Sequence, residues 1–486
     1  MSLYKISRYT YLNKIDNENY YLINSLNQEL IFGDKNLKSI FNTFLHTAEK
    51  SEISRFVKGK KIQKWLFDNN FLVLSNSEVD LTEMKKESEN KDGKLTLLRI
   101  LLTDVCNFDC KYCKVEKNLK SISEKAIGNA MLEKTIKVYF SDQGKNEVKV
   151  VHITGGEPLI FWDKVKKIVS LISMYKNYAG KTMIVLGTNS YLLDNDKVEY
   201  IKNNEIKVIV SLDGEKVHND KLRVLKNGDS TFNVVDKSIK LLRTSGVEVG
   251  ISLVVGKHNI KSIEKIIRFF LKEYNPASLG VNFMKPPSKN DKNFPFMITP
   301  NEYVEGMYRV YKIFRDKGLF FELIHRRLHP FVYKKFRYHD CGAALGSTMN
   351  IDAKGRIGPC KSFLVMEKIF ESDVDQSAVN KMSSVLRQRA PITNADCLRC
   401  EAIAICGGGC SYSAYLKDGN YLGVDDDACR YSKLFHHEII KDIFELVNKK
   451  IKKNIFYIIS DYDRKKLLGK IKENKMSLSS SIGHEN

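Results

Sequence analysis

Short apolar runs alternate with amphipathic stretches through the middle of the chain. The apolar runs are expected to be strands and lie at 95–102, 148–153, 183–186, 208–212, 247–255 and 278–283. The stretches between them have the spacing of helices that pack by one face, for example 162–175, 234–243 and 262–274. Six strands alternating with helices predict an α/β fold, an open, partial (β/α)6 barrel over residues 95–285. In such a barrel the chemistry lies at the C-terminal ends of the strands.

The pattern at the N-terminus is different and predicts a small separate domain, residues 1–75. The expected elements are a hairpin, two helices and a short strand, at 9–15 with 20–26, 37–45, 57–67 and 71–74. Their order gives a winged-helix-like outline. The polar, charge-dense segment 76–94 has no strong periodicity and predicts a linker.

The C-terminal part is predicted to hold a connector, 286–340, a loop-rich region, 341–430, and a basic helical tail, 431–486. The loop-rich region cannot close a large apolar core, so it would need metal to fold. No segment approaches the roughly eighteen uninterrupted apolar residues of a membrane span, and the N-terminal residues lack a hydrophobic signal. We therefore expect a cytoplasmic protein that does not enter the membrane.

Composition adds the thiols and the charge. The chain has 486 residues, 43% of them hydrophobic, which excludes a disordered chain, and a formal net charge of +21. Cytoplasmic thiols are kept reduced, so they are more often metal ligands or catalysts than disulfides. The ten cysteines fall into two runs: Cys106, Cys110 and Cys113, and then Cys341, Cys360, Cys397, Cys400, Cys406, Cys410 and Cys429. None is left for ordinary core packing.

The first run, Cys106-Asn-Phe-Asp-Cys110-Lys-Tyr-Cys113, directly follows the first predicted barrel strand. Three thiolates can bind three irons of a 4Fe-4S cube and leave the fourth iron without a protein ligand. A structural zinc ion would normally want a fourth Cys or His nearby. The spacing and its place at a strand end therefore favour a cluster with one open iron.

This loop, followed by Gly155-Gly156-Glu157-Pro158 after the second strand, closely resembles the radical S-adenosylmethionine (SAM) enzymes. The resemblance implies that the SAM amine and carboxylate chelate the open iron. It also implies that one electron from the cluster cleaves SAM to a 5'-deoxyadenosyl radical, which abstracts hydrogen from the substrate. The protein would then supply position and the exclusion of water.

The resemblance implies contacts to the methionyl amine and the adenine. Gly155, Gly156 and Glu157 match the glycine-rich edge that receives the amine, which needs backbone carbonyls and a carboxylate. Tyr112, the aromatic residue before the third cysteine, matches the place where the adenine packs.

It also implies contacts to the SAM carboxylate and ribose. Ser211 and Arg223 resemble the pair that holds the carboxylate in peptide-modifying members, and Asp213 lies in the same Ser-Leu-Asp-Gly turn. An Arg fork suits a carboxylate geometrically. Asn189 is the candidate ribose neighbour, although Ser190 stands where the usual Thr-Asn-Gly has glycine. No catalytic acid or base can be identified.

Seven cysteines in the second run are too many for a single four-thiolate zinc site and suggest two clusters. The full pattern resembles the SPASM domain, which carries two auxiliary 4Fe-4S clusters, so the resemblance implies three clusters in all. It assigns the distal cluster to Cys397, Cys400, Cys406 and Cys429, and the proximal one to Cys341, Cys360 and Cys410. Residues 342–359 lack the eighth cysteine of some members. An open iron, a water or another side chain could fill that place.

The N-terminal pattern resembles the PqqD-like domain that captures a leader peptide as an added β-strand. Together these resemblances lead to the hypothesis of a radical SAM maturase that installs a thioether, carbon-carbon or ether crosslink in a ribosomally made peptide. The auxiliary clusters would remove the second electron. The implied partners are a precursor peptide with its leader and a reducing electron donor such as flavodoxin or ferredoxin.

Two alternatives remain at this point. An anaerobic sulfatase maturase forming formylglycine shares the barrel and SPASM pattern, but it has Asp after the second SPASM cysteine, where this chain has Lys361, and no unit like residues 1–75. A non-enzymatic zinc or nucleic-acid-binding protein would fit the winged-helix outline and the charge of +21. However, the basic excess is spread along the chain and no basic recognition helix stands out, so the charge favours an acidic leader instead.

Overall fold

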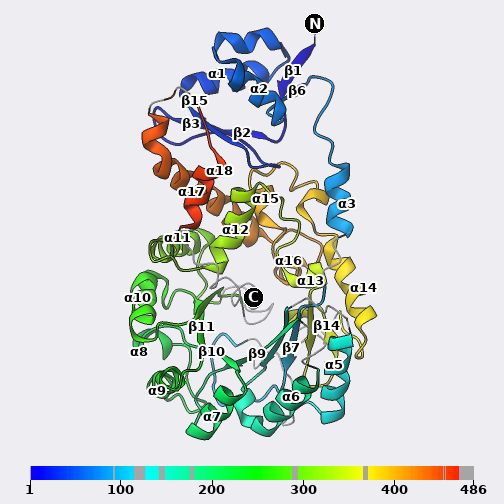
Figure 1. The fold of residues 1–486 in the computed structure, drawn as a ribbon, viewed down its shortest axis with the longest axis vertical. Coiled ribbons are helices and arrows are strands. Elements are labelled where there is room, and N and C mark those ends of the chain that lie inside the picture. Colours follow the sequence, from blue (N-terminus) through cyan, green and yellow to red (C-terminus); the bar gives the residue numbers. More distant parts are fainter. Residues whose placement is uncertain are drawn as a thin grey trace.

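The computed structural model describes residues 2–90, 94–113, 126–141, 148–175, 180–286, 294–364, 370–452, 454 and 456–469. Figure 1 shows the N-terminal unit at one end of the long axis and the barrel at the other. Helices of the connector, the cysteine-rich region and the tail lie between them.

The described chain is centred on an eight-stranded sheet of order β12-β11-β10-β9-β8-β7-β13-β14. The six strands predicted for the barrel are all present and parallel: β7 (Leu97–Leu101), β8 (Val148–Thr154), β9 (Lys181–Thr188), β10 (Lys207–Ser211), β11 (Val249–Val255) and β12 (Ser278–Phe283). Most of their aliphatic side chains are buried, as in other parallel sheets. The prediction of an open α/β barrel is confirmed.

Helices ring the outer face of this sheet (Figure 1). They are α5 (Asn129–Ser141), η2 (Pro158–Phe161), α6 (Trp162–Met174), α7 (Asn195–Asn203), α8 (Lys216–Asn219), α9 (Phe232–Thr244), η4 (Ile260–Ser262) and α10 (Ile263–Glu273). In α10 the fully buried residues Ile263, Ile266, Ile267 and Phe270 repeat at helical spacing and form the stripe that packs inward. Because each crossover returns the chain in the same direction, the C-terminal ends of β7 to β12 form one rim.

The cysteine-rich region extends the barrel sheet. Strand β13 (Thr348–Ile351) pairs in parallel with β7, and β14 (Ile357–Gly358) pairs antiparallel with β13. On the first of these pairs, Arg99 donates to Oδ1 of Asn350 at 2.9 Å. These two strands were not predicted. The helices of the region are α13 (Gly342–Leu345), α14 (Gln376–Arg387), η6 (Pro391–Thr393), α15 (Ile403–Cys406) and α16 (Ser411–Asp418).

The connector and the tail pack on each other. Their elements are α11 (Pro300–Asp316), α12 (Glu322–Tyr333), α17 (Asp426–Ile451), β15 (Phe456–Ile458), α18 (Asp461–Lys465) and η7 (Lys466–Leu468). Asp442 of α17 accepts a hydrogen bond from the Tyr308 hydroxyl at 3.1 Å and forms an ion pair with Arg315. The predicted tail beyond residue 469 lies outside the described residues. Across the described chain, no helix combines the length and apolar character needed to cross a membrane.

The N-terminal unit contains the predicted hairpin, two helices and closing strand, together with strands that the sequence pattern did not predict. Its elements are β1 (Leu3–Ile6), β2 (Thr10–Lys14), β3 (Tyr20–Asn24), β4 (Leu30–Gly33), α1 (Lys35–Phe44), β5 (Ala48–Glu49), η1 (Lys50–Arg55), α2 (Lys60–Asp68) and β6 (Leu72–Leu74). They form two sheets, of order β5-β1-β6 and β15-β4-β3-β2.

The segment predicted as a linker contains a helix, α3 (Thr82–Asn90), which docks on the chain just before Cys341. The Tyr338 hydroxyl donates to Glu87 at 2.8 Å, and the His339 ring is 3.0 Å from the Ser88 carbonyl. The polar composition that suggested a linker therefore belongs to a helix held by hydrogen bonds at one face.

Strand β15 joins the tail to the N-terminal unit by pairing antiparallel with β4. Beyond it, the fully buried Arg464 donates to the Phe331 carbonyl at 2.9 Å and lies 3.3 Å from the Glu29 carboxylate. Lys334 also pairs with Glu29, at 3.1 Å. The edge of β4, which would be open in the isolated unit, is thus covered by the chain's own tail.

We expect Arg464→Met to lower the stability of the N-terminal unit by about 2 kcal/mol, because Glu29 would lose one of its two cationic partners in a buried setting. Thermal unfolding of the full chain followed by circular dichroism should show a midpoint several degrees lower. Lys465→Met, at an exposed neighbour in the same helix, is the matched control. Equal midpoints for the two variants would contradict a structural role for the Arg464 ion pair.

Candidate functional site

The first cysteine loop leaves the C-terminal end of β7 and lies across the rim of the barrel. The backbone N–H groups of Asp109 and Lys111 donate to the carbonyls of Val224 and Leu222, at 2.8 and 2.9 Å. Burial raises the pKa of the Cys110 thiol, and nearby Arg223 opposes this shift. The repulsion of Cys113 and Cys106 raises that pKa further, so the structure places the three predicted thiols within electrostatic reach of one another.

Gly155 and Gly156 allow the turn after β8 to lie against the backbone that leads into this loop. A Cβ atom at Gly155 would stand 2.5 Å from the Thr103 carbonyl oxygen, and one at Gly156 would stand 2.1 Å from that of Val105. Gly155 also has a φ of +138°, which other residues rarely adopt. The Gly156 N–H donates to Thr103 at 2.6 Å, and the next N–H donates to Val105 at 2.7 Å. The two glycines therefore allow the close contact that fixes the position of the cysteine loop against the turn after β8.

Glu157 is fully buried and ties the ends of β8 and β9 together. Its carboxylate accepts hydrogen bonds from the Leu159 N–H at 3.0 Å, the Thr188 hydroxyl at 2.6 Å and the Asn189 N–H at 2.8 Å. Burial raises the pKa of Glu157 to about 7, against the effect of these three donors. The side chain predicted to meet the methionyl amine is thus committed to the protein scaffold, and the adjacent glycine backbone faces the cysteine loop.

Asn189 reaches the first cysteine from the end of β9. Its side-chain amide donates to Oδ1 of Asn107 at 2.8 Å, and the same nitrogen lies 3.8 Å from the Cys106 sulfur. Asn107 was not predicted from the sequence, because an asparagine between two cysteines is not part of a recognisable motif. Ser190 adopts a left-handed φ of 58°, a conformation that glycine adopts at lower cost.

Asp213 is the centre of a buried polar cluster at the end of β10. Arg223 contacts it twice, at 2.9 Å and 3.1 Å, and the Tyr112 hydroxyl donates to it. Burial raises the pKa of Asp213, but the opposing effects of Arg223 and the neighbouring His258 are larger. The pKa of Asp213 therefore lies well below its usual range. Asp213 therefore holds Arg223 in place. Ser211, the last residue of β10, lies at the same rim.

The Arg223 guanidinium also lies over the Tyr112 ring, 5.4 Å from its centroid. Because burial and the nearby Asp213 carboxylate keep the pKa of Tyr112 well above its usual value, with Arg223 opposing, the phenol stays protonated and donates. The structure thus brings Asp213 and Arg223 against Tyr112 and Cys110, which lie about a hundred residues earlier in the chain.

The remaining seven thiols separate into two groups. Burial raises the pKa of Cys360 to about 12, with further repulsion from Cys410 and Cys341. Burial likewise raises the pKa of Cys397 to about 12, with repulsion from Cys406, Cys400 and Cys429. These are the sets of three and four that the resemblance assigned to the proximal and distal clusters. The four-thiol set lines a single cavity.

A run of three glycines separates the two groups. Residues Gly407, Gly408 and Gly409 all have positive φ, between 69° and 83°. A Cβ atom at Gly409 would stand 2.4 Å from that of Ala428 at the start of α17. This left-handed backbone turns the chain sharply, which allows Cys406 and Cys410 to belong to different groups although few residues separate them.

The donor sets suit iron–sulfur clusters. Within the described ranges, no three Cys, His, Asp or Glu side chains converge closely enough to hold a single metal ion. In a cubic cluster each thiolate binds a different iron, so the sulfur atoms do not need to meet at one point. Groups of three, three and four thiols therefore fit three 4Fe-4S clusters, and the individual ligand assignments stay predictions.

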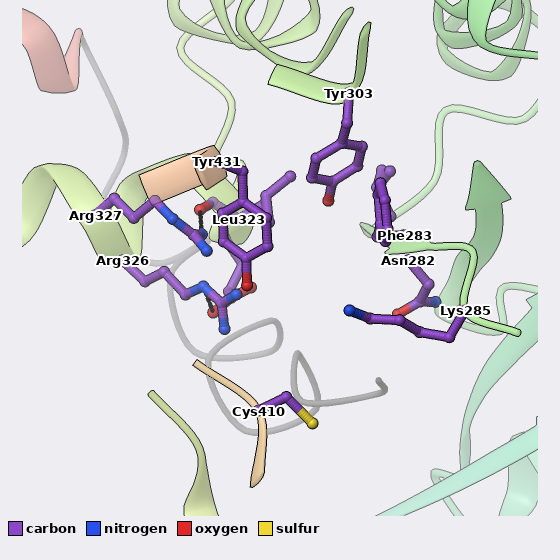
Figure 2. A pocket seen from close by; sticks show the side chains of 11 residues that line it. Asn282, Phe283, Lys285, Tyr303, Leu323, Arg326, Arg327, Cys410 and Tyr431 are labelled. Carbon is purple, nitrogen blue, oxygen red and sulfur yellow. Dashed lines mark hydrogen bonds and ion pairs between the residues drawn. The ribbon is translucent and has the colours of Figure 1, made fainter. Parts of the chain in front are cut away.

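A narrow cavity lies between the barrel rim and the proximal thiols. Figure 2 shows side chains from the end of β12, from α11, α12 and α17, and Cys410 arranged around it. Its walls are formed by Val281, Asn282, Phe283, Lys285, Tyr303, Glu322, Leu323, Arg326, Arg327, Cys410 and Tyr431. Apart from Cys410, none of these residues was predicted, because they come from separate elements and form no local motif.

Comparison with known proteins agrees with this geometry. Residues 100–270 match the Radical SAM superfamily. The chain is 26% identical over 216 residues to a cysteine-type anaerobic sulfatase-maturating enzyme of Clostridium novyi. This match covers 43% of this chain and 57% of that enzyme. It is 24% identical over 368 residues to AlbA, an antilisterial bacteriocin subtilosin biosynthesis protein of Bacillus subtilis, covering 71% of this chain and 72% of AlbA. The chain therefore spans little more than half the length of the first relative.

The fold also resembles that of Streptococcus suis SuiB, whose crystal structure holds its precursor peptide SuiA. The TM-score is 0.53 at 18% sequence identity, and the match covers 88% of this chain and 100% of that chain. At this identity the likeness concerns the fold alone.

We expect Gly156→Ala to displace the first cysteine loop, because its Cβ atom would overlap the Val105 carbonyl. After anaerobic reconstitution, bound iron should fall from about twelve to about eight atoms per chain, with the loss at the first cluster. Gly128→Ala is the matched control, since nothing lies within 4 Å of a Cβ atom there. Full iron loading of the Gly156 variant would show that the close approach does not set the loop.

Proposed function

We propose that this chain, which is a radical SAM enzyme related to the anaerobic sulfatase-maturating enzymes and to AlbA and SuiB, installs an intramolecular crosslink in a ribosomally made precursor peptide. The observation that carries this proposal is the cavity that has the end of β12 on one side and Cys410 on the other. A peptide side chain in this cavity would lie between the barrel rim and the proximal thiols.

Residues at the rim would hold the cofactor. SAM bound with a reduced 4Fe-4S cluster on Cys106, Cys110 and Cys113 supplies a 5'-deoxyadenosyl radical, which can abstract hydrogen from carbon. Arg223, fixed by Asp213, would bind the SAM carboxylate through its guanidinium. The packed rim would restrict water near the substrate.

We further propose that the N-terminal unit binds a leader as an added strand. Strand β15 already covers the edge of β4, so the leader would pair with β5, with β6 or with the outer edge of β15. In the sheet that contains β15, the opposite edge strand is β2, which contacts the cysteine-rich region. There the Asn13 side-chain amide donates to the Glu401 carboxylate at 3.1 Å. The net charge of +21 favours an acidic leader.

Formylglycine formation is the second candidate, and the likeness to the Clostridium novyi enzyme favours it. Two features of this chain argue for crosslinking instead. Lys361 follows Cys360, where the sulfatase maturases have Asp, and a lysine ammonium cannot accept a proton. The N-terminal unit also gives the chain a surface for a leader, which a sulfatase peptide does not need.

Mass spectrometry of a co-expressed peptide tests the proposal. A short open reading frame next to the gene is co-expressed with the enzyme. The peptide it encodes should be about 2 Da lighter, for each crosslink, than the same peptide made without the enzyme. Fragmentation should then stop between the joined residues. An aldehyde trapped by a hydrazide reagent would instead identify the sulfatase-type reaction and contradict crosslinking.

The two cysteine runs should separate on mutation. We expect Cys410→Ala to retain SAM cleavage, measured as 5'-deoxyadenosine, and to lose peptide crosslinking, because Cys410 lines the cavity away from the first loop. Cys106→Ala is the matched variant and should lose both activities, since its thiol belongs to the first group. Crosslinking by the Cys410 variant at the wild-type rate would contradict a role for the proximal group.

A further inference from the structure

We propose that Lys285, together with Arg326, forms a carboxylate-binding subsite in the cavity of Figure 2, and that it takes an acidic side chain or the C-terminal carboxylate of the substrate peptide. This inference rests on the proposed function, because it assigns part of the cavity to the peptide. It specifies which chemical group of the substrate would be recognised.

Lys285 is a buried cation without an anionic partner among the described residues. Its side chain follows β12 and is only 9% exposed, and Figure 2 shows the ammonium group directed into the cavity. Within the described chain, its nitrogen has no hydrogen-bond acceptor, and its ring contact is with Phe283 at 5.1 Å. An ammonium group taken out of water is costly unless an anion or acceptor meets it.

The opposite wall adds positive charge. Arg326 lies 3.8 Å from Glu322 and 3.8 Å from Asp340, so neither carboxylate forms a close bidentate pair with it. Arg327 donates to the Leu323 carbonyl at 2.7 Å and stacks against Tyr431. Among the described residues, Lys285, Arg326 and Arg327 outnumber the two nearby carboxylates, Glu322 of the wall and Asp340 beside Arg326, so the cavity favours an anion.

The polar neighbours suit a carboxylate. Burial raises the pKa of Tyr303 to about 12, so this phenol is protonated and can donate. Asn282 keeps its amide oriented by donating to Ser252 at 3.2 Å. A planar carboxylate between an ammonium and a guanidinium gains charge-assisted hydrogen bonds on both sides. The cavity is narrow, so it admits the end of a side chain and not a folded segment.

Small capped peptides test the subsite on the reconstituted, SAM-loaded full chain, so that Arg223 is occupied. The probes are acetyl-Gly-Glu-Gly-amide, its Gln counterpart and the free acid acetyl-Gly-Gly-Gly, with affinities measured by NMR titration. We expect one of the two carboxylate probes to bind about tenfold more tightly than the Gln peptide. Which probe binds identifies the source of the carboxylate as a side chain or a chain end.

Substitutions at Lys285 provide the second arm. Lys285→Met should remove that tenfold preference, and Lys285→Arg should restore most of it, because the charge returns. Lys272→Met, at a side chain that is 84% exposed on α10, is the matched control and should keep the preference. Iron content and the electron paramagnetic resonance spectrum of the clusters serve as the check that the variants are folded.

Two results would overturn the subsite. One is equal binding of the acidic and Gln probes to the wild-type chain. The other is an altered cluster spectrum in Lys285→Met with unchanged probe affinities, which would mean that Lys285 serves the proximal cluster. By contrast, Lys285-dependent binding of a probe by an enzyme that leaves every peptide mass unchanged would contradict the crosslinking function and keep the subsite.

Discussion

The pairing of β13 with β7 is the contact on which the rest of the arrangement depends. It adds the cysteine-rich region to the barrel sheet through backbone hydrogen bonds, and the Arg99–Asn350 contact supports the same register. Cys341 lies shortly before β13, and Cys360 shortly after β14, so this pairing carries both thiols to the side of the barrel.

Two buried carboxylates hold the rim in different ways. Glu157 is surrounded by donors from β8 and β9 and fixes the backbone around the glycine turn. Asp213 is matched by the charge of Arg223 and positions that guanidinium above Tyr112. Each group would be costly to bury alone, and each is compensated by partners from other strands. The rim is therefore a rigid frame in which both buried carboxylates serve as supports and Asp213 holds the Arg223 guanidinium in place.

The tail links the two ends of the molecule. By supplying β15 to the N-terminal sheet and Arg464 to both Glu29 and the Phe331 carbonyl, it holds the N-terminal unit on the connector helix α12. A leader bound to that unit would therefore approach the cavity from a fixed direction. The sequence pattern indicated only a basic helical cover here, because three residues of strand have no periodicity of their own and become a strand only by pairing.

The amino-acid sequence by itself determined the six barrel strands, the cysteine loop at a strand end and the division of the thiols into runs of three and seven, since these depend on local periodicity and spacing. Only the tertiary structure decided which side chains meet: Asn107 with Asn189, Asp213 with Arg223 and Tyr112, and Lys285 with the wall of α12. A single lysine or asparagine carries no local pattern. The role of such a residue depends on its neighbours in the folded chain, which come from elements that are distant in the sequence.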